Sequence, residues 1–284
     1  MEKRRIDLHV HSNCSDGTMT PSELVAYAQE KNLAAFALTD HDTVKGLKEA
    51  MEASRGIDVE VIAGIEFSTN YHGQDVHIVG LDIGYEDAKF LEQTEIFRDA
   101  RNIRNEKMIR RMQEDGIDIS KEQMKEAFQD AIWTRAHFAR YLTEHGYAKD
   151  MQDAFTRFLG DHGIYFVPRE KATPAQAVEL IFQSGGIPIL AHPLLYHLDE
   201  PGLCKLFLEL KNAGLIGVEA LYSTHSQKDE NLVRHLAKCY NLKISGGSDF
   251  HGSNKPGIDL GCGRGALKIP YEVLEGLRER REKV

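Results

Sequence analysis

The 284-residue sequence has few cysteines and no pattern that would join them. Its four cysteines, Cys14, Cys204, Cys239 and Cys262, lie far apart and form no Cys-x-x-Cys pair. This spacing argues against a disulfide framework and against a zinc site built from thiolates. It is typical of a protein in a reducing compartment, so we expect the chain to be cytoplasmic.

The sequence also lacks long apolar runs, repeats and a strong basic character. No run approaches the roughly 20 apolar residues of a transmembrane helix, and the first ten residues, MEKRRIDLHV, lack the apolar core of a signal peptide. We therefore expect no membrane insertion. A net charge of -9 argues against a surface that coats duplex nucleic acid. The length permits one large domain or two small ones.

Short apolar or β-branched runs recur along the chain and indicate strands. Helical segments follow them, and two of these begin with a capping-box spacing and proline at the first helical position, at Thr20-Pro21-Ser22-Glu23 and Thr173-Pro174-Ala175-Gln176. This alternation predicts an α/β fold with a mostly parallel sheet, and the absence of a dinucleotide glycine motif favours a closed barrel. The seven predicted strands cover residues 5–11, 33–40, 59–68, 76–83, 186–192, 215–222 and 242–249.

One stretch, residues 93–167, has helical signals but no strand signal. We interpret it as a helical insertion, or cap, between two parts of the barrel at residues 1–92 and 168–284. Within it, Arg101, Arg104 and Arg111 fall close to one helical face. By itself, such a row of arginines is more often a solvated surface than a binding site.

Histidines and carboxylates gather near the predicted strand ends, where barrel enzymes carry their catalytic residues. His9 and His11 end the first strand on one side of it, about 7 Å apart along the backbone. Burying many such groups together would be costly without a cation, so we predict a metal site. Nitrogen and oxygen donors without sulfur suit zinc, manganese or iron. The six histidines and three carboxylates are His9, His11, Asp16, His41, Glu66, His77, His192, Asp249 and His251.

The order of these motifs resembles the PHP (polymerase and histidinol phosphatase) superfamily. The resemblance implies a distorted (β/α)7 barrel with two or three divalent metal ions, for which we expect manganese, with zinc and iron as alternatives. The motifs that carry it are His9-x-His11, Ser15-Asp16-Gly17, Thr39-Asp40-His41-Asp42, Gly64-Ile65-Glu66, His77, Ala191-His192-Pro193 and Ser248-Asp249-Phe250-His251.

The resemblance also implies which residues hold each ion, with Glu66 as a bridge between the first two. The implied sets are His9, His11, Glu66 and Asp249 for the first ion, Glu66, His77 and His192 for the second, and Asp16, His41 and His251 for the third. His41 and Asp249 are expected to be catalytic as well. Asp16 stands where some PHP phosphatases have histidine, which indicates the nucleotide-handling branch.

The sequence is similar in particular to the PHP branch of nucleoside 3',5'-bisphosphate phosphatases and 5'-to-3' exoribonucleases. In that branch the insertion contributes an arginine- and asparagine-rich helix and a Thr-Arg-x-His-x-Ala segment to the substrate site. Residues 101–105 and 134–139 match these segments. His225 is implied as a substrate contact or proton donor, and hence as a catalytic candidate. The implied substrate-binding residues are Arg101, Asn102, Arg104, Asn105, Arg135 and His137.

The expected reaction is hydrolysis of a nucleoside 3',5'-bisphosphate to the 5'-monophosphate and phosphate. Metal ions would activate water, and arginine forks would bind the second phosphate. The same clamps suit a short RNA, so a 5'-to-3' exoribonuclease is the first alternative. A histidinol-phosphate phosphatase would not need the arginine-bearing insertion. An amidohydrolase commonly has a metal-bridging lysine at a strand end, and a non-catalytic PHP module usually has lost ligands; neither trait is present here.

Overall fold

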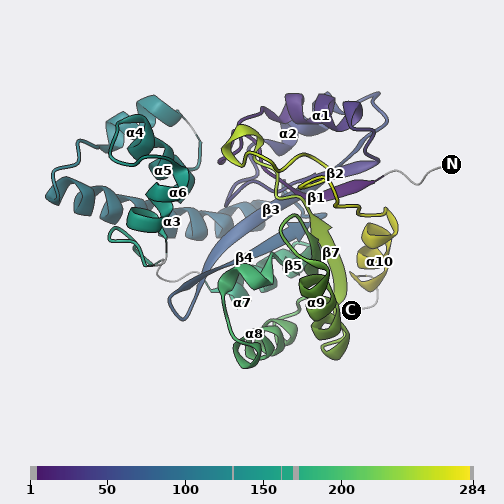
Figure 1. Ribbon diagram of the computed structural model, residues 1–284. Helices are drawn as coiled ribbons and strands as arrows, with labels where there is room; N and C mark the ends of the chain where they lie inside the picture. The colour runs from purple at the N-terminus through teal and green to yellow at the C-terminus, as the bar shows by residue number, and fades with distance from the viewer. Residues whose placement is uncertain (1–4, 130, 161, 169–172, 282–284) are drawn as a thin grey trace.

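The computed structural model describes residues 5–281 except 130, 161 and 169–172. The described part of the chain forms one seven-stranded sheet surrounded by helices (Figure 1). All seven predicted strands are present, and the α/β barrel fold is confirmed. The strands are β1 (Ile6–Val10), β2 (Ala35–Leu38), β3 (Glu60–Tyr71), β4 (Gln74–Leu81), β5 (Ile187–Leu190), β6 (Gly217–Tyr222) and β7 (Lys243–Gly247).

Ten α-helices occur within the described ranges, and none of these is both long and apolar enough to cross a membrane. The two predicted capping boxes are confirmed at Thr20 and Thr173. The helices are α1 (Pro21–Glu30), α2 (Leu47–Ala53), α3 (Ala88–Glu114), α4 (Lys121–Phe128), α5 (Arg135–Glu144), α6 (Met151–Ala154), α7 (Pro174–Gln183), α8 (Glu200–Asn212), α9 (Gln227–Cys239) and α10 (Glu272–Arg281). A π-helical turn, η1 (Phe155–Leu159), and two 3-10 turns, η2 (Pro193–Tyr196) and η3 (Gly252–Asn254), complete them.

The strands are paired in sequence order, and four of the six ladders between the described strands are parallel. β4 is the exception, because it runs antiparallel to both β3 and β5. The expected alternation of strand and helix fails here. His72 and Gly73 have φ of 51° and 93°, which forms a two-residue hairpin turn without an intervening helix.

The barrel is nearly closed where β1 approaches the residues that follow β7. The amide of Asp249 donates to the His9 carbonyl oxygen at 2.9 Å, and the amide of His11 donates to the Phe250 carbonyl oxygen at 3.0 Å. These bonds bring the ends of the first and last strands together. The C-terminal ends of the parallel strands therefore meet at one mouth.

The core covers both faces of the sheet. In β2, Phe36 and Leu38 belong to one buried apolar cluster, whereas Ala35 and Ala37 belong to another. Successive strand side chains point to opposite faces, so each face has its own packed layer. The near-continuous apolar strand sequences follow from this double burial.

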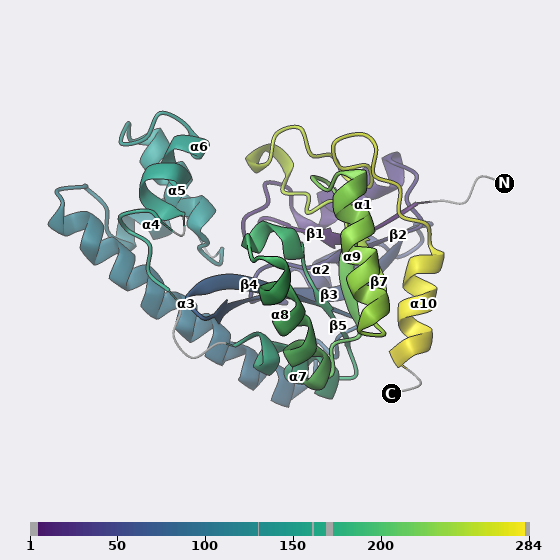
Figure 2. The same cartoon turned by 60° about the horizontal axis from the view of Figure 1, so that its bottom comes forward.

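Between β4 and β5, the C-terminal part of α3 together with α4, α5 and α6 forms a helical group with a core of its own, whereas α7 packs on the barrel. Phe90 and Phe97 of α3 join the core of the barrel, whereas Met108 and Met112 of the same helix join a second core with α4, α5 and α6. Figure 2 shows α3 running past the barrel to these helices. The domain boundary expected between residues 92 and 93 thus lies inside α3, and the division of the chain remains our interpretation.

Candidate metal centre and substrate cavity

The nine predicted ligand residues lie together at the mouth of the barrel. They form four overlapping groups, and within each group one ligand atom per residue lies within 4.8 Å of the others. Eight of the nine are buried, and His77 is half-buried. The groups are His11, Asp16, His41 and His251; His9, Glu66 and His192; His9, His11 and Asp249; and His41, Glu66 and His77.

Glu66 is the centre of this arrangement, because its two oxygens face different imidazoles. Oε1 lies 2.9 Å from His77 Nδ1 and 3.2 Å from His192 Nε2. Oε2 lies 3.2 Å from Nε2 of both His9 and His11. A carboxylate that bridges two cations needs one oxygen toward each ligand set. The geometry therefore fits the bridging position that the resemblance implies for Glu66.

The third predicted set adjoins the first. Asp16 Oδ1 lies 3.2 Å from His251 Nε2, and Asp16 Oδ2 lies 3.7 Å from His41 Nε2. The ring of His11 stacks on that of His251 with centroids 4.1 Å apart. The nine side chains consequently form one continuous cluster rather than three isolated sites.

Among the described residues, several buried nitrogen and oxygen atoms of this cluster have no hydrogen-bond partner and are free to bind a cation. His9 Nε2, His11 Nε2 and Asp16 Oδ1 are buried and make no hydrogen bond within the described part of the chain. A buried polar atom without a partner costs about 1–3 kcal/mol. Imidazole nitrogens and carboxylate oxygens are donors that zinc, manganese and iron accept. The donor set thus fits divalent metal ions, and the assignment of each ligand stays a prediction.

The charges in the cluster also suit metal binding. Burial would raise the pKa of Glu66, but the imidazoles of His41 and His9 hold it well below its usual range. Burial lowers the pKa of His11 and of His41. Burial alone would lower the pKa of His9 too, but the carboxylates of Glu219 and Glu66 raise it well above the usual value. Binding of a cation at His9 would therefore release a proton.

The backbone explains how these side chains reach the mouth. His77 lies inside β4, opposite Ser68 of β3, and the antiparallel hairpin brings it to the same edge as the ends of the parallel strands. Asp249 and His192 have φ of 57° and 21°, in a region that residues other than glycine rarely adopt. Such conformations cost about 1–3 kcal/mol each and are frequent at functional sites.

Glu219 is a buried residue of the site that the sequence did not single out. Its Oε1 lies 2.8 Å from His9 Nδ1, and its Oε2 accepts from the backbone amide of His192 at 2.7 Å. A carboxylate behind a metal-binding histidine fixes the ring orientation and leaves the other nitrogen free for the ion. The signal in the sequence was a carboxylate in an otherwise apolar strand.

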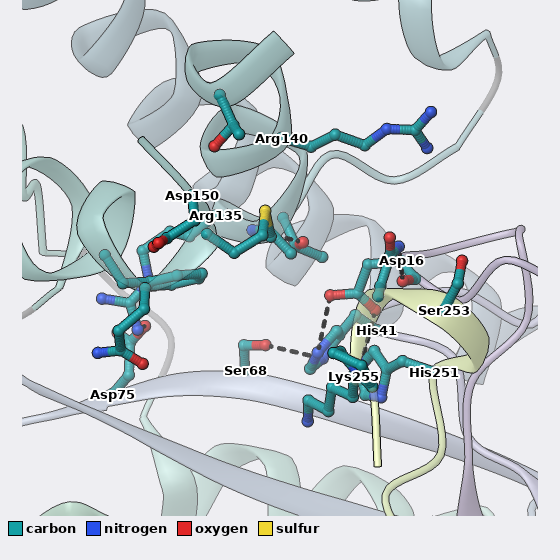
Figure 3. Close-up of a pocket in the computed structure, with 18 of the residues that line it drawn as sticks. Asp16, His41, Ser68, Asp75, Arg135, Arg140, Asp150, His251, Ser253 and Lys255 are labelled. Carbon is teal, nitrogen blue, oxygen red and sulfur yellow. Dashed lines mark hydrogen bonds and ion pairs between the residues drawn. The ribbon is translucent and has the colours of Figure 1, made fainter. Parts of the chain in front are cut away.

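A cavity of about 900 Å³ lies beside the cluster (Figure 3). Asp16, His41, His77 and His251 form the part of its wall that belongs to the barrel. The helical group supplies another part of the wall, and the three arginines predicted to bind substrate are there, together with a fourth. These four residues are Arg101, Arg104, Arg135 and Arg140.

Two of these arginines are held by carboxylates of the barrel. Nε and Nη2 of Arg101 both lie 2.8 Å from Asp42 Oδ2, and Nη2 donates to Ser68 Oγ at 3.0 Å. Ser68 Oγ lies 3.2 Å from His41 Nδ1. Arg101 thus links the helical group to the metal-site cluster, a role that the sequence did not suggest. Arg135 Nη2 lies 3.0 Å from Asp75 Oδ2.

Other predicted site residues do not line this cavity among the described residues. Asn102 is exposed on α3, whereas Asn105 is buried and donates to the Trp133 carbonyl oxygen at 3.0 Å. His137 caps α5 by accepting the Thr134 amide at 3.0 Å, and it lines an adjoining groove. His225 Nδ1 bonds the carbonyl oxygen of Ala220, five residues earlier in the chain, at 3.0 Å. Their roles toward a substrate remain predictions.

Comparison with known proteins identifies the family. The PHP domain model matches residues 7–166, which is more than half of the chain. The chain belongs to the PHP domain family. It is a metal-dependent phosphoesterase of that family, and hence a hydrolase.

Similar proteins agree with this placement. A 5'-3' exoribonuclease of Haemophilus influenzae is 36% identical over 87% of this chain and 90% of its own length. A 3',5'-nucleoside bisphosphate phosphatase of Chromobacterium violaceum is 33% identical over 90% of each chain. The solved structure of an amidohydrolase from Chromobacterium violaceum, with bound sulfate and no metal, is 31% identical, with a TM-score of 0.84 over 97% of this chain and 96% of that chain.

Proposed function

We propose that this PHP phosphoesterase hydrolyses nucleoside 3',5'-bisphosphates to nucleoside 5'-monophosphates and phosphate. The observation that carries the proposal is the division of one cavity. Predicted metal-ligand side chains of the barrel form one part of its wall, and arginines of α3 and α5 form another. A substrate with two phosphates matches both parts. The names of the relatives, a bisphosphate phosphatase among them, also support it.

The chemistry at the barrel wall follows from the donor set. Divalent ions, when bound there, lower the pKa of water and offset the charge of the phosphoryl oxygens. Glu66, Asp16 and Asp249 provide the negative charge that holds such ions, because neighbouring groups keep the pKa of each carboxyl well below its usual range despite burial. The burial of His9 and His11 keeps bulk water from the inner ligands. No side-chain nucleophile is required.

The arginines of the helical group would hold the second phosphate. A guanidinium fork matches two phosphate oxygens, and it keeps its charge at any pH that the protein tolerates. Arg135 is suited to this because its partner Asp75 also lines the cavity, so a phosphate can compete with that carboxylate for the guanidinium. Positioning by the distal phosphate would raise turnover at the metal centre as well as binding.

A panel of phosphate-release assays with manganese tests the proposal. The substrates are adenosine 3',5'-bisphosphate, adenosine 3'-monophosphate, adenosine 5'-monophosphate and histidinol phosphate. We expect the bisphosphate to have the highest kcat/KM and to yield adenosine 5'-monophosphate. A higher kcat/KM for histidinol phosphate would contradict the proposal and favour that alternative.

Variants of one arginine test the second phosphate site. Arg135→Met should lower kcat/KM for the bisphosphate at least tenfold and change that for the 3'-monophosphate little. Arg157→Met is the matched control, because Arg157 pairs with Asp153 at the same 3.0 Å but does not line the cavity. Equal losses on the two substrates in Arg135→Met would contradict this role of the arginine.

A second candidate function is 5'-to-3' exoribonuclease activity on short RNA. A groove of about 390 Å³ adjoins the cavity and shares Ala136, Arg140 and Asn254 with it. Lys45, on the barrel side, also lines the groove, so a longer strand would meet a further cation beyond the first nucleotide. The test is digestion of a 5'-phosphorylated RNA of five nucleotides followed by chromatography. Successive release of 5'-mononucleotides would support it, and an intact oligonucleotide would exclude it.

A further inference from the structure

Lys255 places a positive charge at the border between the metal-ligand cluster and the cavity. It directly follows η3, four residues after His251, and its side chain lines the cavity (Figure 3). Its Nζ donates to Asp249 Oδ2 at 2.6 Å, yet the side chain remains 37% exposed. The ammonium group is thus fixed at one end of the cavity but still open to a ligand there.

Lys255 bonds only one oxygen of Asp249, Oδ2, and leaves the other oxygen, Oδ1, for the metal-ligand cluster. Asp249 Oδ1 faces the imidazoles, 3.3 Å from His251 Nδ1 and 3.5 Å from His11 Nε2. Oδ2 points the other way and also accepts the hydroxyl of the buried Tyr222 at 2.7 Å. Tyr222 thus holds Oδ2 from the buried side, and Lys255 bonds the same oxygen from the side of the cavity.

Two other cations of the cavity wall, Arg101 and Arg135, are held differently. Arg101 is held by Asp42 and Arg135 by Asp75, which are not among the nine predicted ligands. Lys255, in contrast, is bonded to Asp249, which is one of those ligands. Only the carboxylate of Asp249 would therefore separate the lysine charge from a bound metal ion. Its flexible stem and three donor hydrogens allow it to reach a group bound beside that carboxylate.

We propose that Lys255 is a catalytic residue that donates a charge-assisted hydrogen bond to an oxygen of the phosphoryl group under attack. This rests on the proposed phosphomonoester hydrolysis. The water oxygen forms the new P–O bond, and the P–O bond to the nucleoside breaks with its electron pair on the leaving oxygen. Solvent takes the proton lost by water and returns one to the leaving oxygen. Lys255 keeps its own proton and offsets the phosphoryl charge throughout.

The loss expected on removing Lys255 is large. Removal of one hydrogen-bond donor aimed at developing negative charge typically lowers kcat by about 10²–10³-fold. We therefore expect Lys255→Met, in the manganese-loaded 284-residue chain, to lower kcat for adenosine 3',5'-bisphosphate about 100-fold. Lys255→Arg, which keeps the charge, should recover a large part of it. The second readout is calorimetric binding of inorganic phosphate, which should weaken about tenfold or more in Lys255→Met.

Lys31→Met is the matched control. Lys31 also bonds an aspartate, Asp259, at 2.6 Å and is 28% exposed, but it does not line the cavity. Metal content is measured in all variants by mass spectrometry. Unchanged turnover and phosphate affinity in Lys255→Met would overturn the proposal. A loss that follows the manganese content and disappears with excess manganese would also overturn it, because Lys255 would then only support Asp249.

The two proposals can fail separately. If the parent protein releases no phosphate from any nucleotide but binds inorganic phosphate in a Lys255-dependent manner, the nucleotide substrate is wrong and the phosphoryl contact stands. If the parent is active on the bisphosphate and Lys255→Met is equally active, the nucleotide substrate stands and the role of Lys255 is refuted.

Discussion

Replacing Glu219 with glutamine tests how the protein prepares His9 for a metal ion. The carboxylate accepts from two directions, with Oε1 at 2.8 Å from His9 Nδ1 and Oε2 at 2.7 Å from the His192 amide. A glutamine of the same shape has a single acceptor oxygen. If that oxygen keeps the His192 amide, the NH₂ group faces His9 Nδ1. A neutral His9 ring would then carry its proton on Nε2, the nitrogen that faces Glu66.

This change of tautomer should weaken metal binding at His9. Loss of the carboxylate behind a ligating histidine typically costs 10–100-fold in metal affinity, which corresponds to about 1.4–2.7 kcal/mol. We expect the affinity of metal-free Glu219→Gln for manganese, measured by calorimetry or by competition with a fluorescent chelator, to fall by this factor. Phosphate release at limiting manganese should fall in parallel and recover at high manganese.

Glu60→Gln provides the control. Glu60 is also a strand carboxylate with two partners, Tyr271 at 2.6 Å and Arg278 at 2.7 Å, but these groups lie outside the metal-ligand cluster. Its manganese affinity should equal that of the parent. The reasoning is refuted if Glu219→Gln binds manganese as tightly as Glu60→Gln does.

Two further variants test packing and titration. A Cβ at Gly247 would overlap the His9 side chain and lie 2.8 Å from the His9 amide nitrogen, so Gly247→Ala should lower the free energy of unfolding in urea by about 1–3 kcal/mol. Gly276→Ala is the comparison, because a Cβ there meets only Lys243 Nζ at an ordinary contact distance of 3.9 Å. Equal free energies of unfolding for the two variants would contradict this. Burial lowers the pKa of His137 to about 4. In the unfolded chain His137 binds a proton below about pH 6.5, whereas in the folded chain it does so only near pH 4. Acidification from pH 7 to pH 4 should therefore lower the free energy of unfolding of the parent by up to about 3 kcal/mol more than that of His137→Asn. Parallel stability curves would exclude that contribution.

Much of the fold could be predicted because the strands are buried on both faces. Runs such as those of β2 and β5 are apolar throughout, and both strands form where the sequence placed them. The helix starts at Thr20 and Thr173 were equally local signals. The reversal at β4 was not predicted, because it depends on two residues, His72 and Gly73, that adopt positive φ. The apolar run of β4 resembles those of the parallel strands, so the sequence did not reveal that a two-residue turn reverses the chain before it.

The candidate site was predictable to the extent that its residues are chemically conspicuous. Histidines at strand ends such as His9 and His192 were found from spacing and motif order. The supporting contacts were not, because they join segments far apart in the chain. Glu219 meets His9 across 210 positions, and Arg101 meets Asp42 across 59. No local sequence pattern encodes such pairs. The barrel brings Glu219 of β6 to His9 of β1, and the packing of α3 against the barrel brings Arg101 to Asp42.

The contacts of Arg101 change the meaning of the arginine row on α3. As a sequence pattern it suggested either a solvated face or a phosphate clamp, but Arg101 is 2% exposed and bonds Asp42 and Ser68. Ser68 in turn contacts His41, which is a predicted metal ligand. A substrate that shifts the Arg101 side chain would therefore change the position of His41 through two hydrogen bonds. The helical group therefore has a direct physical connection to the cluster. Recognition by the insertion and chemistry at the barrel need not be independent functions of this chain.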